Sequence, residues 1–587
     1  MDPHTNTAKE KKTTKTKSFR ANARILHRFN STGNNFLDKL EKYAKDRSAE
    51  NLSYVGRSAY RVLRVKHVLH HHKLWNVSSG IPIGSMLQTP QNSIFSSTND
   101  PSERHSDWFP EKMLEIMGRT KVWCDIMSLT IPDGIFLDKL IEGLSTIVEN
   151  AKNAEKPVVI RILVGNIIGA PARCTYLVKK LTKNLSEDAN IHLWVGAWRK
   201  GVSWNHAKLI AVDGRYLLQG GHNLWDAHYL KNNPVHDLSM EMEGRITHDG
   251  HLFANSQWRY IRRKQLTRCG YVIDRFIPDA VLVPWKSRVT VTEYPVNKAS
   301  EFPPIYNADL VPKYEKPSGS VPTLSLGRYG RLTFGRPSDD AFIAMFGSAK
   351  TIIRLSIQDL GPVCVPKTQI ALPGCTWPKP YLNALAEAIW DRDVKVEIVV
   401  SNPGSVPGGL NPLEANYGNG WSCVDCAAEI IKRIQKEFKN NVDDVALRTK
   451  VENNLRICYI RHAGKNVYDD GKSIGNHSKF LCIDNIASYT GSQNLYVCDL
   501  AEWGVLIDDK SETEKILEDY WNPLWEASFI ETDCDVQKVM DSLQINRDGE
   551  PVNKFLPGGK KKLDDAAKMA SVRRVLVEED TTFPIKM

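Results

Sequence analysis

A histidine, a lysine, an aspartate, a glycine and an asparagine recur in this chain as two copies with identical spacing. Both copies fit H-x-K-x4-D-x6-G-x-x-N, and their members are His206, Lys208, Asp213, Gly220 and Asn223 in the first and His477, Lys479, Asp484, Gly491 and Asn494 in the second. Five fixed residues at one spacing arise by chance in well under roughly one chain in a thousand of this length. Two copies so far apart indicate a duplicated domain.

The residue types in the motif suit chemistry at a phosphate group. A histidine and a lysine two positions apart on a strand face the same side, so each copy presents an imidazole beside an ammonium group. Asn223 or Asn494 then returns on the next strand after a glycine turn. Lysine and asparagine donate hydrogen bonds to phosphate oxygens, whereas an imidazole attacks phosphorus or moves a proton. Two facing copies would surround one phosphodiester.

The paired motifs resemble the signature of the phospholipase D superfamily, and the likeness is strongest to its single-chain, bacterial secreted type. The segments that carry the resemblance are residues 86–90, 203–206, 220–223, 234–237 and 491–496. The resemblance runs from about residue 85 to 530 and leaves both ends of the chain outside it. Relatives of this type are exported, whereas no signal peptide is visible in this chain.

The resemblance implies a two-step mechanism with unequal histidines. His206 would attack phosphorus and form a phosphohistidine, while His477 would donate a proton to the leaving alcohol and then take one from the incoming water or alcohol. The expected phosphate-binding residues are Lys208, Lys479, Asn223, Asn494 and Ser492. Since two ammonium groups would hold the phosphate, no metal or other cofactor is expected.

Each histidine also needs a carboxylate to fix its tautomer and orientation. Asp213 and Asp484 lie five residues beyond the motif lysines, so on a strand they project to the opposite face, and the resemblance implies a structural role for them. The orienting role then falls to an acid on the strand that follows each motif. By their position after Asn223 and Asn494, these acids are Asp237 and Glu502.

Strands and helices alternate in the same order before each motif. Apolar runs predict strands at 121–129, 158–164, 191–198, 351–358, 394–400 and 455–460, and helical periodicity predicts helices at 135–144, 171–185, 381–390 and 426–438. This order predicts an α/β fold of two pseudo-symmetric repeats, each a mixed β-sheet flanked by helices, with the active site between them.

Composition shifts divide the chain further. The predicted parts are a basic, largely disordered region at 1–84, a first repeat at 85–285, a linker at 286–325, a second repeat at 326–535 and a mobile tail at 536–587. Residues 1–30 hold eight Lys and Arg against two acids, a surplus of six out of the chain's net charge of +10. This arm is either a solvated tail or a segment attracted to anionic membranes or nucleic acid.

The overall composition is that of a folded soluble protein. Hydrophobic residues make up 42% and charged residues 25% of the 587 residues, and no run of about 18 apolar residues could span a membrane. The 11 cysteines have no repeating spacing, which favours buried free thiols in a reducing compartment. We therefore expect a cytoplasmic monomer, peripheral to a membrane when it meets phospholipid.

Several functions share this motif pair. The first expectation is hydrolysis of glycerophospholipids such as phosphatidylcholine to phosphatidic acid, with transfer to other alcohols as a side activity. A phosphatidyltransferase or lipid synthase and a metal-independent nuclease are alternatives, although the excess basic charge lies in the arm and not around the motifs. A non-catalytic scaffold is disfavoured because both motifs are complete.

Two local features stay open at this stage. The histidines at 206, 222, 228 and 236 fall in one stretch, but they lack a compact metal-ligand spacing. The glycine-rich segment 401–421 is long for a plain connection, and it is either a rim of the site that leans on lipid or a structural loop.

Overall fold

The computed structural model describes residues 49–90, 108–167, 170–186, 188–230, 234–266, 290–294, 303–330, 336–364, 369–371, 375–403, 405, 421–438, 442–496 and 499–547. The expectations for the basic arm before residue 49, for the tail beyond residue 547 and for most of the 401–421 segment lie outside these residues.

The first motif lies in a mixed sheet. Its strands, in spatial order, are β10 (Thr290–Tyr294), β5 (Ile191–Lys200), β4 (Val158–Gly165), β3 (Trp123–Ser128), β7 (Leu209–Val212), β8 (Tyr216–Gly220) and β9 (Asp237–Glu243). Strands β3, β4 and β5 run parallel to one another, and the remaining pairings are antiparallel. The short strands β2 (Leu87–Thr89) and β6 (Ser203–Trp204) pair with β9 and β5.

The second sheet repeats this order. Its strands are β14 (Leu455–Tyr459), β13 (Lys395–Val400), β12 (Ile352–Ile357), β15 (Lys479–Ile483), β16 (Ala487–Gly491), β17 (Glu502–Ile507), β11 (Val321–Arg328) and β1 (Trp75–Pro82). Strands β12, β13 and β14 are again parallel, and the motif strand β15 again pairs antiparallel with the first of them. The predicted α/β fold with two pseudo-symmetric repeats is confirmed.

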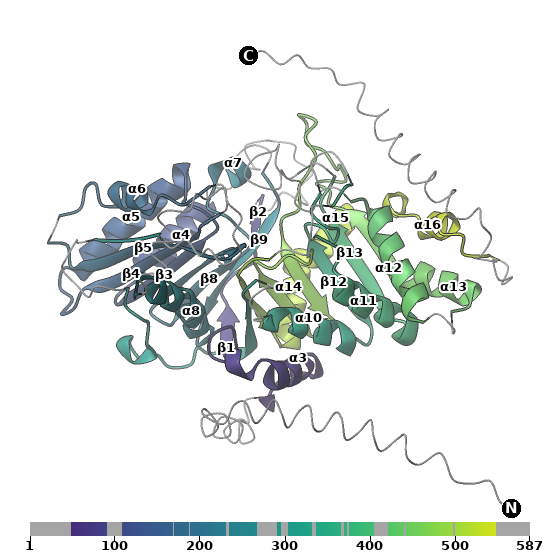
Figure 1. Cartoon of the computed structure of the whole chain (residues 1–587), viewed down its shortest axis with the longest axis horizontal. Helices are drawn as coiled ribbons and strands as arrows, with labels where there is room; N and C mark the ends of the chain where they lie inside the picture. The colour runs from purple at the N-terminus through teal and green to yellow at the C-terminus, as the bar shows by residue number, and fades with distance from the viewer. Residues whose placement is uncertain are drawn as a thin grey trace, which may run out of the picture. The chain divides into compact units, whose positions relative to one another are not determined.

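Helices cover the outer faces of both sheets and fill the space between them (Figure 1). The outer helices are α4 (Trp108–Gly118), α5 (Gly134–Ala151) and α6 (Cys174–Leu181) in the first repeat and α10 (Pro337–Ser348), α11 (Lys379–Arg392), α12 (Cys423–Glu437) and α13 (Asp444–Asn454) in the second. The inner helices are α8 (Ile246–Leu266), α14 (Lys510–Ile516), a π-helical turn (Leu517–Trp521) and α15 (Asn522–Ser528).

Alternating side chains divide each sheet between two cores. On β4, Ile160 and Ile162 pack toward the outer helices, while Leu163 belongs to a central core that also contains Phe253 of α8 and Trp503 of β17. This alternation is the reason the strand reads as a continuous apolar run, because both of its faces are buried. The central core joins the inner faces of the two sheets and thereby fixes the positions of the two motifs.

The domain borders expected from composition differ from the structure in three places. Helix α3 (Tyr54–Lys66) and β1 are regular elements within the region expected to be largely disordered, and β11 begins within the expected linker. Helix α16 (Val536–Ser542) lies in the expected tail. The reason is pairing: β1 contacts β11 along most of its length and β9 at its end, so it joins the two sheets.

Two findings bear on the expected setting. No helix among the described residues has both the length and the apolar character needed to cross a membrane. No disulfide joins the cysteines in the described segments, and all of these cysteines except Cys375 are buried.

Candidate active site

The backbone around each motif histidine is bonded to the other repeat. The amide of His206 donates to the carbonyl of Ala501 at 2.8 Å, and the amide of His477 donates to the carbonyl of His236 at 2.7 Å. These carbonyls immediately precede β17 and β9, respectively. Each motif therefore enters the site alongside the start of a strand from the opposite sheet.

The side chains of the two motif histidines also contact residues of the opposite sheet. Nδ1 of His206 lies 2.9 Å from Oε2 of Glu502, and Nδ1 of His477 lies 2.6 Å from Oδ2 of Asp237. A carboxylate at Nδ1 keeps the proton of a neutral imidazole on that nitrogen and leaves Nε2 with its lone pair. Both acids named from the sequence are thus placed against histidines, and each comes from the repeat that does not contain its partner.

Both motif lysines are buried beside the histidines. Nζ of Lys208 donates to the carbonyl of His206 at 2.7 Å, and Lys479 makes the equivalent short hydrogen bond to the carbonyl of His477. Their exposed fractions are 5% and 1%. Each ammonium group also acts on a carboxylate of the site, because Lys208 lowers the pKa of Glu502 and Lys479 lowers that of Asp237.

Burial and the lysines shift the acid–base behaviour of the histidines. Burial lowers the pKa of His206 to about 4, with Glu502 opposing and Lys208 adding to the shift. Burial and the charge of Lys479 lower the pKa of His477 to about 3 against the attraction of Asp237. In the substrate-free protein at neutral pH, both imidazoles are therefore neutral.

The pKa values of the two carboxyl groups are lowered, although burial alone would raise them. Burial alone would raise the pKa of Asp237, but His477, Lys479 and His222 lower it below its usual range. The pKa of Glu502 is likewise lowered, because His206, Arg328 and Lys208 together outweigh its burial. Both acids are therefore ionised partners for their histidines.

Different residues hold the two carboxylates. The hydroxyl of Tyr229 donates to Oδ2 of Asp237 at 2.7 Å and accepts from the amide of Asn223 at 3.2 Å. On the other side, the hydroxyl of Ser492 donates to Oε2 of Glu502 at 2.6 Å. The sequence analysis missed Tyr229, which ends the short helix α7 (Asp226–Tyr229) between motif and acid; its place midway between Asn223 and Asp237 was the available signal.

Ser492 was expected to bind phosphate, and the structure gives it another contact. Besides donating to Glu502, its oxygen accepts the amide hydrogen of Trp503 at 3.1 Å. A contact with phosphate would therefore require the hydroxyl to leave the carboxylate. Its counterpart Gly221 has no side chain, and an added Cβ there would lie 2.0 Å from Oδ1 of Asp237.

The motif asparagines keep acceptor and donor groups in the site. Asn223 and Asn494 are each 2% exposed, and neither side-chain oxygen has a hydrogen-bond partner among the residues that the structure describes. The side-chain nitrogen of Asn494 donates to the hydroxyl of Tyr496 at 2.9 Å. Because amide oxygen and nitrogen interchange by a rotation, either asparagine can present its NH2 group to a bound anion.

The motif aspartates lie at the far ends of their strands and hold backbone amides. Asp213 accepts from the amides of Lys121, Val122 and Trp123 at 2.7–3.0 Å. Asp484 accepts in the same way from the amides at positions 350–352 at 2.7–2.8 Å. Neither carboxylate contacts a motif histidine, and each fastens the start of the neighbouring parallel strand.

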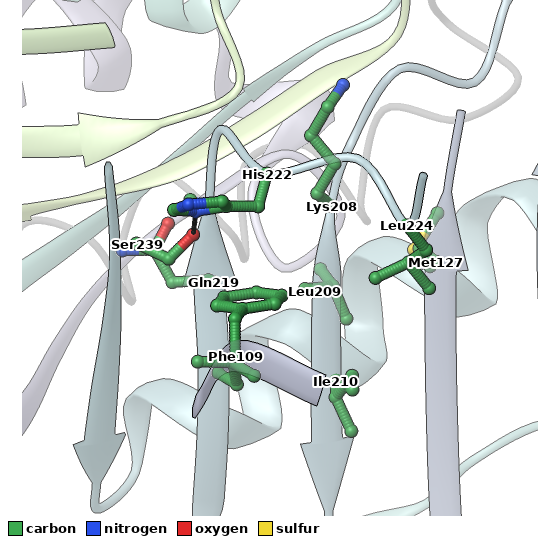
Figure 2. A pocket seen from close by; sticks show the side chains of 11 residues that line it. Phe109, Met127, Lys208, Leu209, Ile210, Gln219, His222, Leu224 and Ser239 are labelled. Atoms are coloured by element: carbon green, nitrogen blue, oxygen red, sulfur yellow. Dashed lines mark hydrogen bonds between the residues drawn. The ribbon is translucent and has the colours of Figure 1, made fainter. Parts of the chain in front are cut away.

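A small cavity of about 20 Å³, enough for about one water molecule, lies behind the first motif. Figure 2 shows Lys208 pointing away from the ring of Phe109 and from Ile210. His222 bonds Ser239 at 2.7 Å through Nδ1 (Figure 2) and Thr89 at 3.0 Å through Nε2, so both of its nitrogens are engaged within the protein. The residues around this cavity pack against the first motif.

His236, another histidine of the first motif region, is bonded within the protein. His236 bonds the carbonyl of Thr89 and the hydroxyl of Tyr520, both at 3.1 Å. Within the described ranges, no three or more His, Cys, Asp or Glu side chains are grouped so that they could hold a metal ion.

Known proteins match the chain to different extents. No protein-family model matches it. A curated phospholipase D of Streptomyces antibioticus is 24% identical over 485 residues, which cover 76% of this chain and 82% of that protein. The crystal structure of a Haemophilus influenzae phosphatidylserine synthase aligns with 89% of this chain and 98% of its own, with 12% identity and a TM-score of 0.46.

A second solved structure, the phospholipase D family member Nuc of Salmonella typhimurium, aligns with 35% of this chain and 97% of its own, with 17% identity and a TM-score of 0.21. Each motif histidine pairs with a carboxylate of the other repeat, and a curated phospholipase D matches 76% of the chain at 24% identity, so in its sequence and its paired motifs the chain is similar to the phospholipase D superfamily.

Proposed function

We propose that the protein is a phospholipase D-type enzyme that hydrolyses glycerophospholipids, such as phosphatidylcholine, to phosphatidic acid and the free head group. The observation that carries this proposal is the crossed pairing of His206 with Glu502 and of His477 with Asp237 beside two buried lysines. This arrangement supplies a nucleophile, a proton donor and charge compensation for one phosphodiester.

In the first step, Nε2 of His206 attacks phosphorus. A P–N bond forms while the P–O bond to the head-group alcohol breaks, and His477 gives its Nε2 proton to the departing oxygen. Lys208 and Lys479, with Asn223 and Asn494, compensate the charge on the non-bridging oxygens. The products are the free alcohol and a phosphatidyl group bound to His206.

In the second step, water replaces the alcohol. His477, now neutral, takes a proton from the water as its oxygen attacks phosphorus, and the P–N bond to His206 breaks. Phosphatidic acid leaves, and His477 is again protonated. An alcohol that enters in place of water gives a new phosphodiester by the same route, which accounts for transfer to other alcohols as a side activity.

His477 takes the proton that it donates from solvent when the substrate binds. In the free site, burial and Lys479 hold the pKa of His477 low, at about 3. A phosphodiester anion bound between the lysines offsets their charge and attracts the imidazolium form, so it raises that pKa toward neutrality. The site thus assembles its acid only when the anion is in place.

A lipid is favoured as substrate by the match to a curated phospholipase D, although that relative is only 24% identical. The substrate would be met at a membrane surface, with the basic arm at residues 1–30 adding attraction to anionic lipid. The same phosphohistidine chemistry would serve a phosphatidyltransferase, so the incoming alcohol and not the site decides between hydrolysis and synthesis.

The experiment is an assay of the purified chain with labelled phosphatidylcholine vesicles, with and without ethanol. We expect phosphatidic acid alone and a share of phosphatidylethanol when ethanol is present. The His206→Ala variant serves as the inactive control. If neither product forms while single-stranded DNA is degraded without added metal, the lipid proposal is wrong and the nuclease alternative holds.

A further inference from the structure

A row of three buried polar side chains ends at the asparagine of the second motif. Nδ2 of Asn494 donates to the hydroxyl of Tyr496 at 2.9 Å, and this hydroxyl donates to Oε1 of Gln358 at 3.4 Å. Gln358 directly follows β12, whose last residue Ile357 is paired with the motif residue Lys479. The three side chains, which are at most 4% exposed and which we call the Asn494 relay, therefore lie beside the second motif.

The relay leaves the acceptor of the Asn494 amide without a donor. Oδ1 of Asn494 is buried and has no hydrogen-bond partner among the residues that the structure describes. The two branches of a carboxamide carry its acceptor and its donors, so with the NH2 branch held by Tyr496 the remaining branch ends in the oxygen. A phosphodiester anion offers only acceptors, and another acceptor oxygen repels it. Asn494 therefore has to turn its amide before both of its N–H groups can bind such an anion.

The hydroxyl of Tyr496 suits both orientations of that amide, because a phenol both donates and accepts. In the free site it accepts from Nδ2 of Asn494 and donates to Gln358. After a half-turn of the Asn494 amide, it can donate to Oδ1 instead, and Gln358 can turn its own amide and donate to the hydroxyl. Each hydrogen bond of the Asn494 relay is then kept with its direction reversed.

The first repeat has a different residue at the equivalent position. Two residues beyond the motif asparagine stands Trp225 in the first repeat and Tyr496 in the second. The indole N–H of Trp225 donates to the hydroxyl of Thr130 at 2.5 Å, and an indole nitrogen cannot accept a hydrogen bond. A side chain that can serve both orientations of the asparagine therefore stands at this position only in the second repeat.

We propose that Tyr496 is a positioning residue that lets the Asn494 amide turn when a phosphodiester anion enters the site. In the bound state, both N–H groups of Asn494 face the non-bridging oxygens and Tyr496 donates to its Oδ1. The driving force is the anion, because hydrogen bonds to a charged group are about twice as strong as those between neutral groups. This role rests on the proposed function, in which the anion is the phosphate of a lipid.

Calorimetric binding of inorganic phosphate to the full chain tests the turn without a lipid. Lys479→Met removes an ammonium group of the site and defines the phosphate that binds elsewhere. Tyr496→Phe removes the donor for Oδ1 of Asn494, so we expect phosphate to bind about three- to ten-fold more weakly. Gln358→Leu removes the acceptor that holds the hydrogen of the hydroxyl in the free site. The hydroxyl then donates to Asn494, and phosphate should bind at least as tightly as to the parent chain. Unchanged binding in Tyr496→Phe, or weaker binding in both variants, would overturn the proposal.

A double-mutant cycle ties the effect to the asparagine. In Asn494→Ala there is no amide to orient, so adding Tyr496→Phe should not weaken phosphate binding further. An additional loss of the same size in that background would overturn the proposal, since Tyr496 would then act on binding by another route. Tyr294→Phe on β10 removes a hydroxyl that donates to the carbonyl of Ser186 at 2.7 Å; it is the matched control and should bind like the parent chain.

The same variants in the lipid assay separate this role from the proposed function. The value of kcat/KM for phosphatidylcholine should fall in Tyr496→Phe and not in Gln358→Leu. If phosphate binding shows the expected pattern while no lipid is hydrolysed, the role of Tyr496 stands and the lipid substrate is wrong. If lipid is hydrolysed but both variants are impaired alike, the proposed function stands and the role of Tyr496 is wrong.

Discussion

The orienting carboxylates of the two half-sites depend on different hydroxyl groups. Tyr229 holds Asp237 and also takes the amide hydrogen of Asn223, whereas Ser492 holds Glu502. A second hydrogen-bond donor on the carboxylate that bonds the histidine reduces the negative charge of that carboxylate. The carboxylate then stabilises an imidazolium less. The strength of each histidine as a base is therefore tuned separately.

The first prediction concerns the variant Tyr229→Phe. With one donor removed, Asp237 stabilises the imidazolium of His477 better, so the pKa of His477 in the enzyme–substrate complex rises and the alkaline limb of kcat moves to higher pH. We also expect kcat to fall about three- to ten-fold because Asn223 loses an anchor. A pH–rate profile checks both effects. The exposed Tyr176→Phe is the control, and an unmoved alkaline limb would refute the role of Tyr229.

A second prediction compares equivalent positions in the two motifs. Gly221→Ala would put its Cβ 2.0 Å from Oδ1 of Asp237, so this carboxylate must move away from His477. We expect kcat to fall by about 100-fold or more, since small misplacements of an acid–base pair are costly. Ser492→Ala only removes a hydrogen bond and should cost about ten-fold or less. Equal losses measured in the lipid assay would contradict the asymmetry.

At the scale of elements, each motif supplies side chains to the candidate site and an aspartate that holds the start of the neighbouring strand. The period of two along a strand predicts that Asp213 projects away from Lys208, and the resemblance to the phospholipase D superfamily then directs attention to Asp237. The strand period could not show which histidine each acid meets, because that depends on how the two sheets face each other. The crossed pairing and the contact of Tyr229 are products of tertiary packing.

The motif aspartates allow a prediction about strands. In Asp213→Ala, the amides of Lys121, Val122 and Trp123 lose their acceptor at the start of β3. We expect the free energy of unfolding to fall by about 3 kcal/mol, while the pH–rate profile of the remaining folded enzyme keeps its shape. Denaturant titration together with the profile checks this. A shifted profile would mean that Asp213 acts on a histidine after all.

At the scale of the whole molecule, the central core makes one site from two repeats. The duplicated strand order was readable from apolar runs and helical periodicity, and the structure confirms it. The place of β1 and β11 was not readable, because a strand that joins two sheets contributes through pairing partners far away in the sequence, such as Ile81 with Glu243 and Trp75 with Leu326. Composition alone therefore assigned these segments to the disordered N-terminal region and the linker.

The buried histidines predict how stability depends on pH. His206, His222 and His236 have pKa values of about 4, and that of His477 is about 3, compared with about 6.5 in an unfolded chain. As the pH falls from about 6.5 toward 4, the unfolded chain binds more protons than the folded one, so the free energy of unfolding decreases.

Urea titrations at a series of pH values check this expectation, and we anticipate a loss on the order of several kcal/mol across that interval. His222→Gln should flatten the dependence because it removes one titrating group, whose two nitrogens bond Ser239 and Thr89. Stability that stays constant or increases as the pH falls from 6.5 to 4 would show that these histidines are not held neutral by the fold.

The central claim is that two half-sites form one centre in which His206 is the nucleophile. A p-nitrophenyl phosphatidyl ester with labelled phosphorus tests it most directly, because this leaving group needs no proton from His477. In His477→Ala, the first step should then proceed while the second stalls, so label accumulates on the protein. Peptide mapping should find it on His206, and His206→Ala should carry none. Label on another residue, or no label in His477→Ala despite release of p-nitrophenol, would contradict the account.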